Sequence, residues 1–148
     1  MLNRLCEYNN WANSLLFNAL TANSSAVPES CILLFSHIVN AQTIWVCRIN
    51  GTLPDLGVWQ LHNSEACKML LEESANQLLQ ITGKLKPEDA EVIQYTTSTG
   101  DYYETSVFDI LLHVFNHGTY HRAQIAKEMK LHNIEPVGTD YIQFVRLQ

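Results

Sequence analysis

The sequence predicts an all-α protein: a bundle of four long helices, with a short β-hairpin before the last one. Three observations lead to this fold. Apolar residues recur at helical spacing in four long stretches, capping residues stand at the ends of these stretches, and a segment rich in Thr and Tyr changes the period before the last helix. The length of 148 residues suits a single domain, 1–148, and no internal repeat or linker divides it.

The first two helices follow from apolar spacing and from the residues between them. Residues 2–22 carry an apolar stripe, and the polar run 23–25 ends it. Pro28 followed by Glu29 is typical of a first helical turn, and Gly51 is a natural C-terminal cap. We therefore expect the second helix to run from Glu29 to a point just before Gly51.

The second half of the chain contains the hairpin and two further helices. Asn63 or Ser64 can cap a third helix that ends near Gly83. Residues 92–105, which are rich in Thr and Tyr and broken by Gly100-Asp101, predict the hairpin. A capping box from Ser106 to Asp109 begins a fourth helix that ends near Asn133 and Pro136, and residues 141–145 form an apolar tail that should pack on the bundle. A bundle of this size needs at least one long crossover connection.

The charge content excludes several classes of protein. Only 16% of the residues are charged, while 47% are hydrophobic, a combination that excludes intrinsic disorder. The net charge of -6, without a basic stripe, argues against nucleic acid as a partner. Residues 30–47 carry no formal charge, but their polar side chains would be costly in lipid, so we expect a buried helix and no membrane partner.

The four cysteines indicate the cellular compartment. They are widely spaced and form no CxxC pair, and the chain shows no recognisable signal peptide. The four are Cys6, Cys31, Cys47 and Cys67. Reduced and mostly buried thiols in a cytoplasmic protein are therefore the expectation.

Histidines carry the candidate chemistry. His113, His117 and His121 are four residues apart, so they form a column on one side of the fourth helix. Each step advances about 40° around the axis, so either adjacent pair can bind one metal ion, whereas all three would strain a single site. His37 stands on an apolar face of the second helix and could supply a further imidazole ligand.

Simpler roles compete with this interpretation. A histidine like His37 is more often a hydrogen-bonded core residue, and an HxxxH pair alone is a weak motif. The conjunction is stronger, because one metal ion would satisfy several buried imidazoles at once. His62 and His132 fall near loop or helix ends, where capping or solvation is the expected role.

Three segments resemble the DinB/YfiT-like superfamily, whose members are regarded as metal-dependent enzymes. The segment LLHVFNHGTYHRAQIA, residues 111–126, is similar to the signature helix of that superfamily. Residues 34–49, LFSHIVNAQTIWVCRI, resemble its histidine-bearing helix, and YNNWAN, residues 8–13, resembles its first helix. The matches span nearly the whole chain in the right order.

The resemblance implies a fold and a set of metal ligands. The fold would be an up-down-down-up four-helix bundle, often a homodimer, that binds one divalent ion, zinc or nickel being the first choices. The ligands carried over are His37, His117 and His121, and the family gives the position of His113 no metal role. Many relatives have an acidic residue where this chain has Gln42, so a mechanism that needs a carboxylate there is in doubt.

Other side chains are candidates for a pocket or for indirect support of the metal: His113, Gln42, Trp45, Tyr120 and Arg122. For Arg122 a structural ion pair or cap is the stronger interpretation. Trp11 and Phe115 could also line a pocket, but aromatic residues at helical spacing usually belong to the core.

Three histidines leave a coordination position open, as in catalytic metal sites. The resemblance implies a thiol S-transferase that takes a small-molecule substrate and a low-molecular-weight thiol such as bacillithiol or mycothiol. Metal-dependent hydrolysis is the second choice. The alternatives are a non-catalytic metal-binding or dimeric stress-response protein, in which the metal is structural, and a degenerate member with an empty site.

Overall fold

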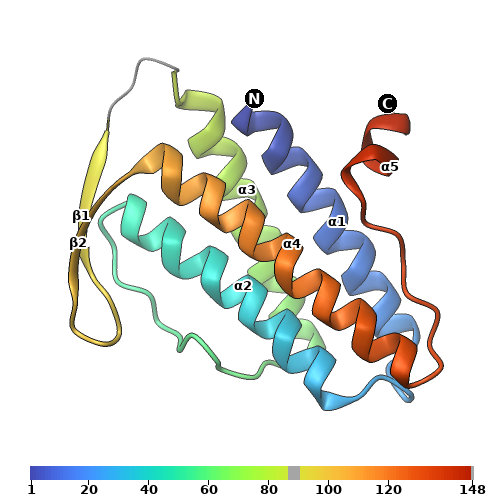
Figure 1. Cartoon of the computed structure of the whole chain (residues 1–148). Helices are drawn as coiled ribbons and strands as arrows, with labels where there is room; N and C mark the ends of the chain where they lie inside the picture. Colours follow the sequence, from blue (N-terminus) through green and yellow to red (C-terminus); the bar gives the residue numbers. More distant parts are fainter. Residues whose placement is uncertain (87–90, 148) are drawn as a thin grey trace.

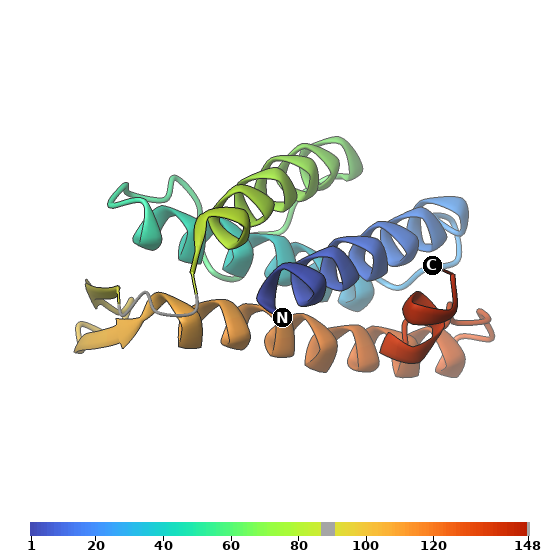
Figure 2. The same cartoon turned by 90° about the horizontal axis from the view of Figure 1, so that it is seen from above.

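The computed structural model describes residues 1–86 and 91–147. The elements follow in chain order as α1 (Leu2–Ala22), α2 (Glu29–Ile49), α3 (Ser64–Lys84), β1 (Val92–Thr96), β2 (Tyr102–Ser106), α4 (Val107–Leu131) and α5 (Tyr141–Arg146) (Figure 1). The mostly helical fold and the hairpin before the last long helix are confirmed. The predicted apolar tail forms the short helix α5, which packs on α1 (Figure 2).

Caps delimit the long helices much as expected. The Asn63 side chain accepts a hydrogen bond from the Ala66 backbone at 2.8 Å, and Gly51 adopts the left-handed conformation just after α2, with φ of 69°. The expected capping box is half formed. The Ser106 hydroxyl accepts from the Asp109 backbone at 3.1 Å, but the Asp109 carboxylate accepts from that same hydroxyl instead of from a backbone N–H.

The four long helices pack so that each contacts two neighbours closely. Helix α2 lies against α3 and α4, and α1 lies against the same two helices, so α1 and α2 are diagonal to each other. One apolar cluster fills the end of the bundle with Leu20, Phe35 and Met129. A second cluster, with Val46 and Leu111, fills the end near the hairpin.

Helix α2 explains the uncharged stretch in the sequence. Within the described part of the chain it is the one helix long and apolar enough to cross a membrane, but most of that stretch is buried inside the bundle. The contacts of α2 with α3 and α4 therefore account for its lack of charged residues, as expected for a core helix of a bundle.

A buried polar layer separates the two apolar clusters. The Arg122 guanidinium donates to the side-chain oxygens of Asn9 at 3.0 Å and Asn13 at 2.7 Å. Both asparagine amides donate to the Gln42 side-chain oxygen, at 2.7 and 2.9 Å, and the Gln42 amide donates to the Ser74 hydroxyl at 2.9 Å. The layer therefore connects all four long helices.

A small residue is required where α4 passes this layer. A Cβ on Gly118 would lie 2.7 Å from the Asn9 side-chain oxygen and 2.9 Å from an Arg122 nitrogen. Since both atoms are held by the hydrogen bonds just described, Gly118→Ala should lower the free energy of unfolding by about 1–3 kcal/mol. Urea denaturation followed by circular dichroism measures this change.

Gly83→Ala is the matched control, because a Cβ on Gly83 of α3 meets nothing within 4 Å. This substitution should leave stability unchanged or raise it by up to about 1 kcal/mol. Equal stability of the two alanine variants would contradict this prediction, because it would show that the polar layer accommodates a Cβ at Gly118 without loss of stability.

Candidate metal centre

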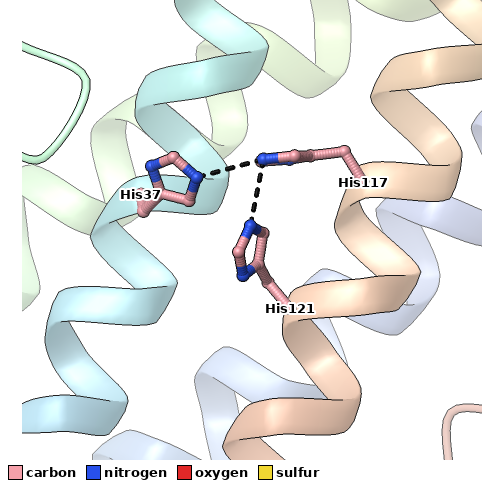
Figure 3. A group of neighbouring side chains, drawn as sticks. All are labelled: His37, His117 and His121. Atoms are coloured by element: carbon pink, nitrogen blue, oxygen red, sulfur yellow. Dashed lines mark hydrogen bonds between the residues drawn. The ribbon is translucent and has the colours of Figure 1, made fainter.

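Three imidazoles converge between α2 and α4 (Figure 3). His37 projects from α2, and His117 and His121 project from successive turns of α4. The Nε2 atom of His117 lies 3.0 Å from Nε2 of His37 and 3.1 Å from Nε2 of His121. One nitrogen of each ring lies within 4.8 Å of the others, so the three residues could hold a metal ion.

Hydrogen bonds on the far side of two rings fix their tautomers. Nδ1 of His37 lies 3.0 Å from the carbonyl oxygen of Val58, and Nδ1 of His121 lies 2.7 Å from the side-chain oxygen of Gln124. Both oxygens can only accept, so each Nδ1 carries the proton and each Nε2 presents a lone pair to the centre. Such outer hydrogen bonds are typical of histidines that bind metals.

The resulting arrangement suits a cation. His117 has at most one proton on Nε2 when neutral, and that proton can satisfy only one of the two facing lone pairs. A tetrahedral zinc site with bonds of about 2.0–2.1 Å places its nitrogens roughly 3.4 Å apart, which is close to the 3.0 and 3.1 Å that separate His117 from His37 and from His121. The donor set therefore fits a divalent ion that accepts imidazole nitrogen.

Burial and mutual repulsion keep the imidazoles of His37 and His117 neutral, which is the form that binds a metal ion. Burial, as the largest cause, and the charges of His121, His37 and His113 together lower the pKa of His117 to about 3. Burial also lowers the pKa of His37, against the raising effect of its hydrogen bond to Val58. Metal ions bind the neutral imidazole, so both shifts favour the binding form at neutral pH.

The loop after α2 covers the cluster. The Trp59 ring stacks on the His37 ring with centroids 3.7 Å apart and planes 5° from parallel. Buried Asn40 holds this loop, because its amide donates to the carbonyl oxygen of Gln60 at 2.8 Å and to that of Val58 at 3.3 Å. His62 donates from its ring to the Asn40 side-chain oxygen at 2.7 Å, so it supports the loop rather than capping a helix.

The other pocket candidates surround the centre in different ways. The His113 ring lies between His117, at a centroid distance of 5.5 Å, and Trp45, at 5.6 Å. Tyr120 is exposed and places its ring edge-on to His121 at 5.0 Å. His113, Trp45 and Tyr120 therefore border the cluster.

Gln42 and Arg122 belong to the buried polar layer. Their hydrogen-bond partners there are Asn9, Asn13, Ser74 and Thr119 rather than the three histidines. Arg122 forms neither an ion pair nor a helix cap within the described residues; instead it donates to two side-chain amide oxygens and a hydroxyl. Trp11 packs with Tyr8 and Phe144 beside α5, and Phe115 lies in the apolar cluster near the hairpin.

All four cysteines are free, as predicted, and none joins the histidine cluster. Burial raises the pKa of the Cys6 and Cys31 thiols to about 11. These side chains are therefore structural at neutral pH.

Sequence reasoning assigned no role to Val58, Trp59 or Asn40, and it gave Gln124 none in fixing the His121 ring. Gln124 carries a usable signal, since it stands three residues after His121 on the same helix. The loop residues carry a weaker one, because only the presence of a Trp in a loop marks them.

The fold and the cluster define a class of protein: a helical bundle whose facing helices could hold a metal ion through three histidines. The DinB family model matches residues 1–148, and the chain belongs to the DinB family. The chain is also similar to Protein DinB of Bacillus subtilis (strain 168). The two are 27% identical over an alignment 154 residues long, which covers 93% of this chain and 90% of that protein.

The lowered pKa of His117 predicts how the metal-free protein responds to acid. An unfolded histidine has a pKa of about 6.5, whereas folded His117 has a pKa of about 3. The unfolded state therefore binds the extra proton between these values, and stability that is complete above pH 6.5 is lost as the pH falls, by at most about 1.4 kcal/mol per pH unit. Urea denaturation between pH 7 and pH 5 measures the slope.

His117→Gln should reduce this slope, because it removes one of the histidines whose pKa the fold lowers; His37 and His113 remain. His132→Gln is the control: exposed His132 follows α4, its ring bonds the Glu128 carbonyl and it lies outside the histidine cluster, so this variant should keep the wild-type slope. A wild-type slope in His117→Gln would refute the assigned environment of His117.

Proposed function

We propose that this protein is a divalent-metal-dependent enzyme whose ion is held by His37, His117 and His121, with one coordination position open to substrate. The observation that carries the proposal is the convergence of three Nε2 atoms, two of them fixed from behind by Val58 and Gln124. Three protein ligands are typical of catalytic rather than closed structural zinc sites. Zinc or nickel is the proposed ion, since imidazole suits both.

A bound divalent ion would supply Lewis acidity and lower the pKa of a water molecule or thiol that reaches it. The chain's own residues prepare the site for that chemistry. Val58 and Gln124 orient two imidazoles, and Trp59 shields one face of His37 from water. Asn40 holds the covering loop in place through two backbone carbonyls.

Thiol S-transfer is our first choice of reaction and metal-assisted hydrolysis the second. No carboxylate within the described residues forms an ion pair with the three histidines, and Gln42 is engaged in the polar layer. A thiol that coordinates the ion would be deprotonated outright, whereas bound water would keep a pKa near 7, so the lack of a carboxylate base favours a thiol. The buried cysteines offer no thiol at the centre, so we propose an external low-molecular-weight thiol.

The course of the helices supports the up-down-down-up arrangement that we propose for this bundle. In Figure 1, α1 and α4 run from top to bottom, while α2 and α3 run from bottom to top. We further propose a cytoplasmic homodimer acting on a small molecule.

Metal analysis tests the ligand set. Protein purified without added metal should contain about one divalent ion per chain, and His117→Gln should lose most of it because two of three ligands bind far more weakly. A chelator should lower the wild-type Tm, since an ion bound only by the folded state stabilises it. His132→Gln should keep both properties. Full metal content in His117→Gln would overturn the ligand assignment.

Cobalt substitution tests the open position. A three-histidine cobalt site with an open position should change its visible spectrum when azide or a small thiol is added, because the added ligand enters the coordination shell. The spectra of wild type and His132→Gln should change alike. A cobalt spectrum that no added ligand alters would favour the structural role of the metal and exclude the enzyme proposed here.

A further inference from the structure

A cleft of about 600 Å³ opens beside the metal centre, between the hairpin and the loop after α2. Its walls are formed by α2, by loop residues 51–54 and 56–58 and by β1 with the turn that follows it. This volume lies within the range of small-molecule sites, roughly 300–1,000 Å³. Figure 1 shows the loop and the hairpin on the same side of α2.

The cleft adjoins the histidine cluster through Val58. This residue lines the cleft, and its carbonyl oxygen accepts the hydrogen bond from Nδ1 of His37. Ile44 also lines the cleft and lies on α2 two turns after His37. One face of α2 therefore leads from the metal centre into the cleft.

Arg48 is the one charged side chain among the described residues that line the cleft. Its guanidinium lies 4.5 Å from the centroid of the Trp45 ring and 4.8 Å from that of Tyr95, so two aromatic side chains hold it in place. Within the described part of the chain, no hydrogen bond or ion pair engages it. Its five donors are available to a ligand.

The surroundings of Arg48 favour an anion. Burial lowers the pKa of its guanidinium, which shows that the charge is partly desolvated and would be stabilised by a negative partner. The neighbouring carboxylate on β2, Glu104, accepts instead from Gln94 and from the Tyr102 hydroxyl. Apolar Leu56 and nearly fully exposed Leu53 complete the opposite wall.

We propose that this cleft binds the carboxylate of a small substrate through Arg48 and its apolar body through Tyr95 and the leucines, with the reacting end directed to the histidine cluster. The last part rests on the proposed function. Arg48 follows His37 by eleven residues, about 16 Å along the helix axis, and its side chain leans back toward His37 as helical side chains do. A molecule the size of a short peptide can span the gap.

Calorimetry with metal-free protein tests the cleft independently of the ion. The probes are 8-mercaptooctanoate and its neutral counterpart 8-mercapto-1-octanol, which share the thiol and the chain. Wild type should bind the carboxylate about tenfold more tightly, as expected for one charge-assisted contact. Equal affinity for the two probes, or no heat from either, would overturn the proposal.

Variants assign the preference to Arg48. Arg48→Gln should abolish it, and Arg48→Lys should keep part of it, since the charge remains but the planar fork is lost. Arg4→Gln is the control for net charge, because Arg4 is exposed on α1 outside the cleft. Circular dichroism confirms that each variant is folded. A full carboxylate preference in Arg48→Gln would overturn the proposal.

The same probes distinguish failure of this proposal from failure of the proposed function. In cobalt-loaded protein, both thiols should alter the visible spectrum, the carboxylate at about tenfold lower concentration. If neither thiol alters the spectrum while calorimetry shows the carboxylate preference, the cleft stands and the open metal position fails. If both alter it at equal concentration, the metal proposal stands and the role of Arg48 fails.

Discussion

The hydrogen-bonded layer around Arg122 is the constraint on which the rest of the structure depends. The side chain is 3% exposed, and its charge has no acidic partner within the described residues. A buried guanidinium is costly unless its donors are satisfied. Asn9, Asn13 and Thr119 accept from its two terminal nitrogens, whereas its Nε has no hydrogen-bond partner within the described residues. Because these residues stand on α1 and α4, the layer fixes the rotation of α4. His121, the residue before Arg122, is thereby directed toward α2.

The direction of these hydrogen bonds explains why Gln42 suits this position. Arg122 donates to the asparagine oxygens, the asparagine amides donate to Gln42, Gln42 donates to Ser74, and Ser74 donates to the Leu71 carbonyl. Every step runs the same way, from the cation to a backbone oxygen. An ionised carboxylate at position 42 could accept from the asparagines but could not donate to Ser74. An amide both accepts and donates, so the chain of bonds is complete.

Periodicity predicted the elements closely, whereas the set His37, His117 and His121 came from the family resemblance, because spacing alone allowed either adjacent pair of histidines on α4. Apolar spacing gave α1 and α2 nearly to the residue, and histidines four residues apart on α4 necessarily share a face. What the sequence could not give depends on contacts between distant loops and helices. The stacking of Trp59 on His37 and the anchoring of its loop by Asn40 follow no repeat. The partners of Gln42 likewise appear only when four helices are packed together.

The polar layer and the histidine cluster are held by different interactions, and this separation bears on how the site works. Within the part of the chain that the structure describes, none of the hydrogen bonds of Arg122 or Gln42 involves a histidine ring. The layer can therefore fix α4 against α1 and α2 before any ion binds. The imidazoles are then held facing one another as neutral groups, with His117 unable to satisfy both neighbours. An ion entering such a site relieves a mismatch that the fold imposes, and little of its binding free energy is spent on ordering the ligands.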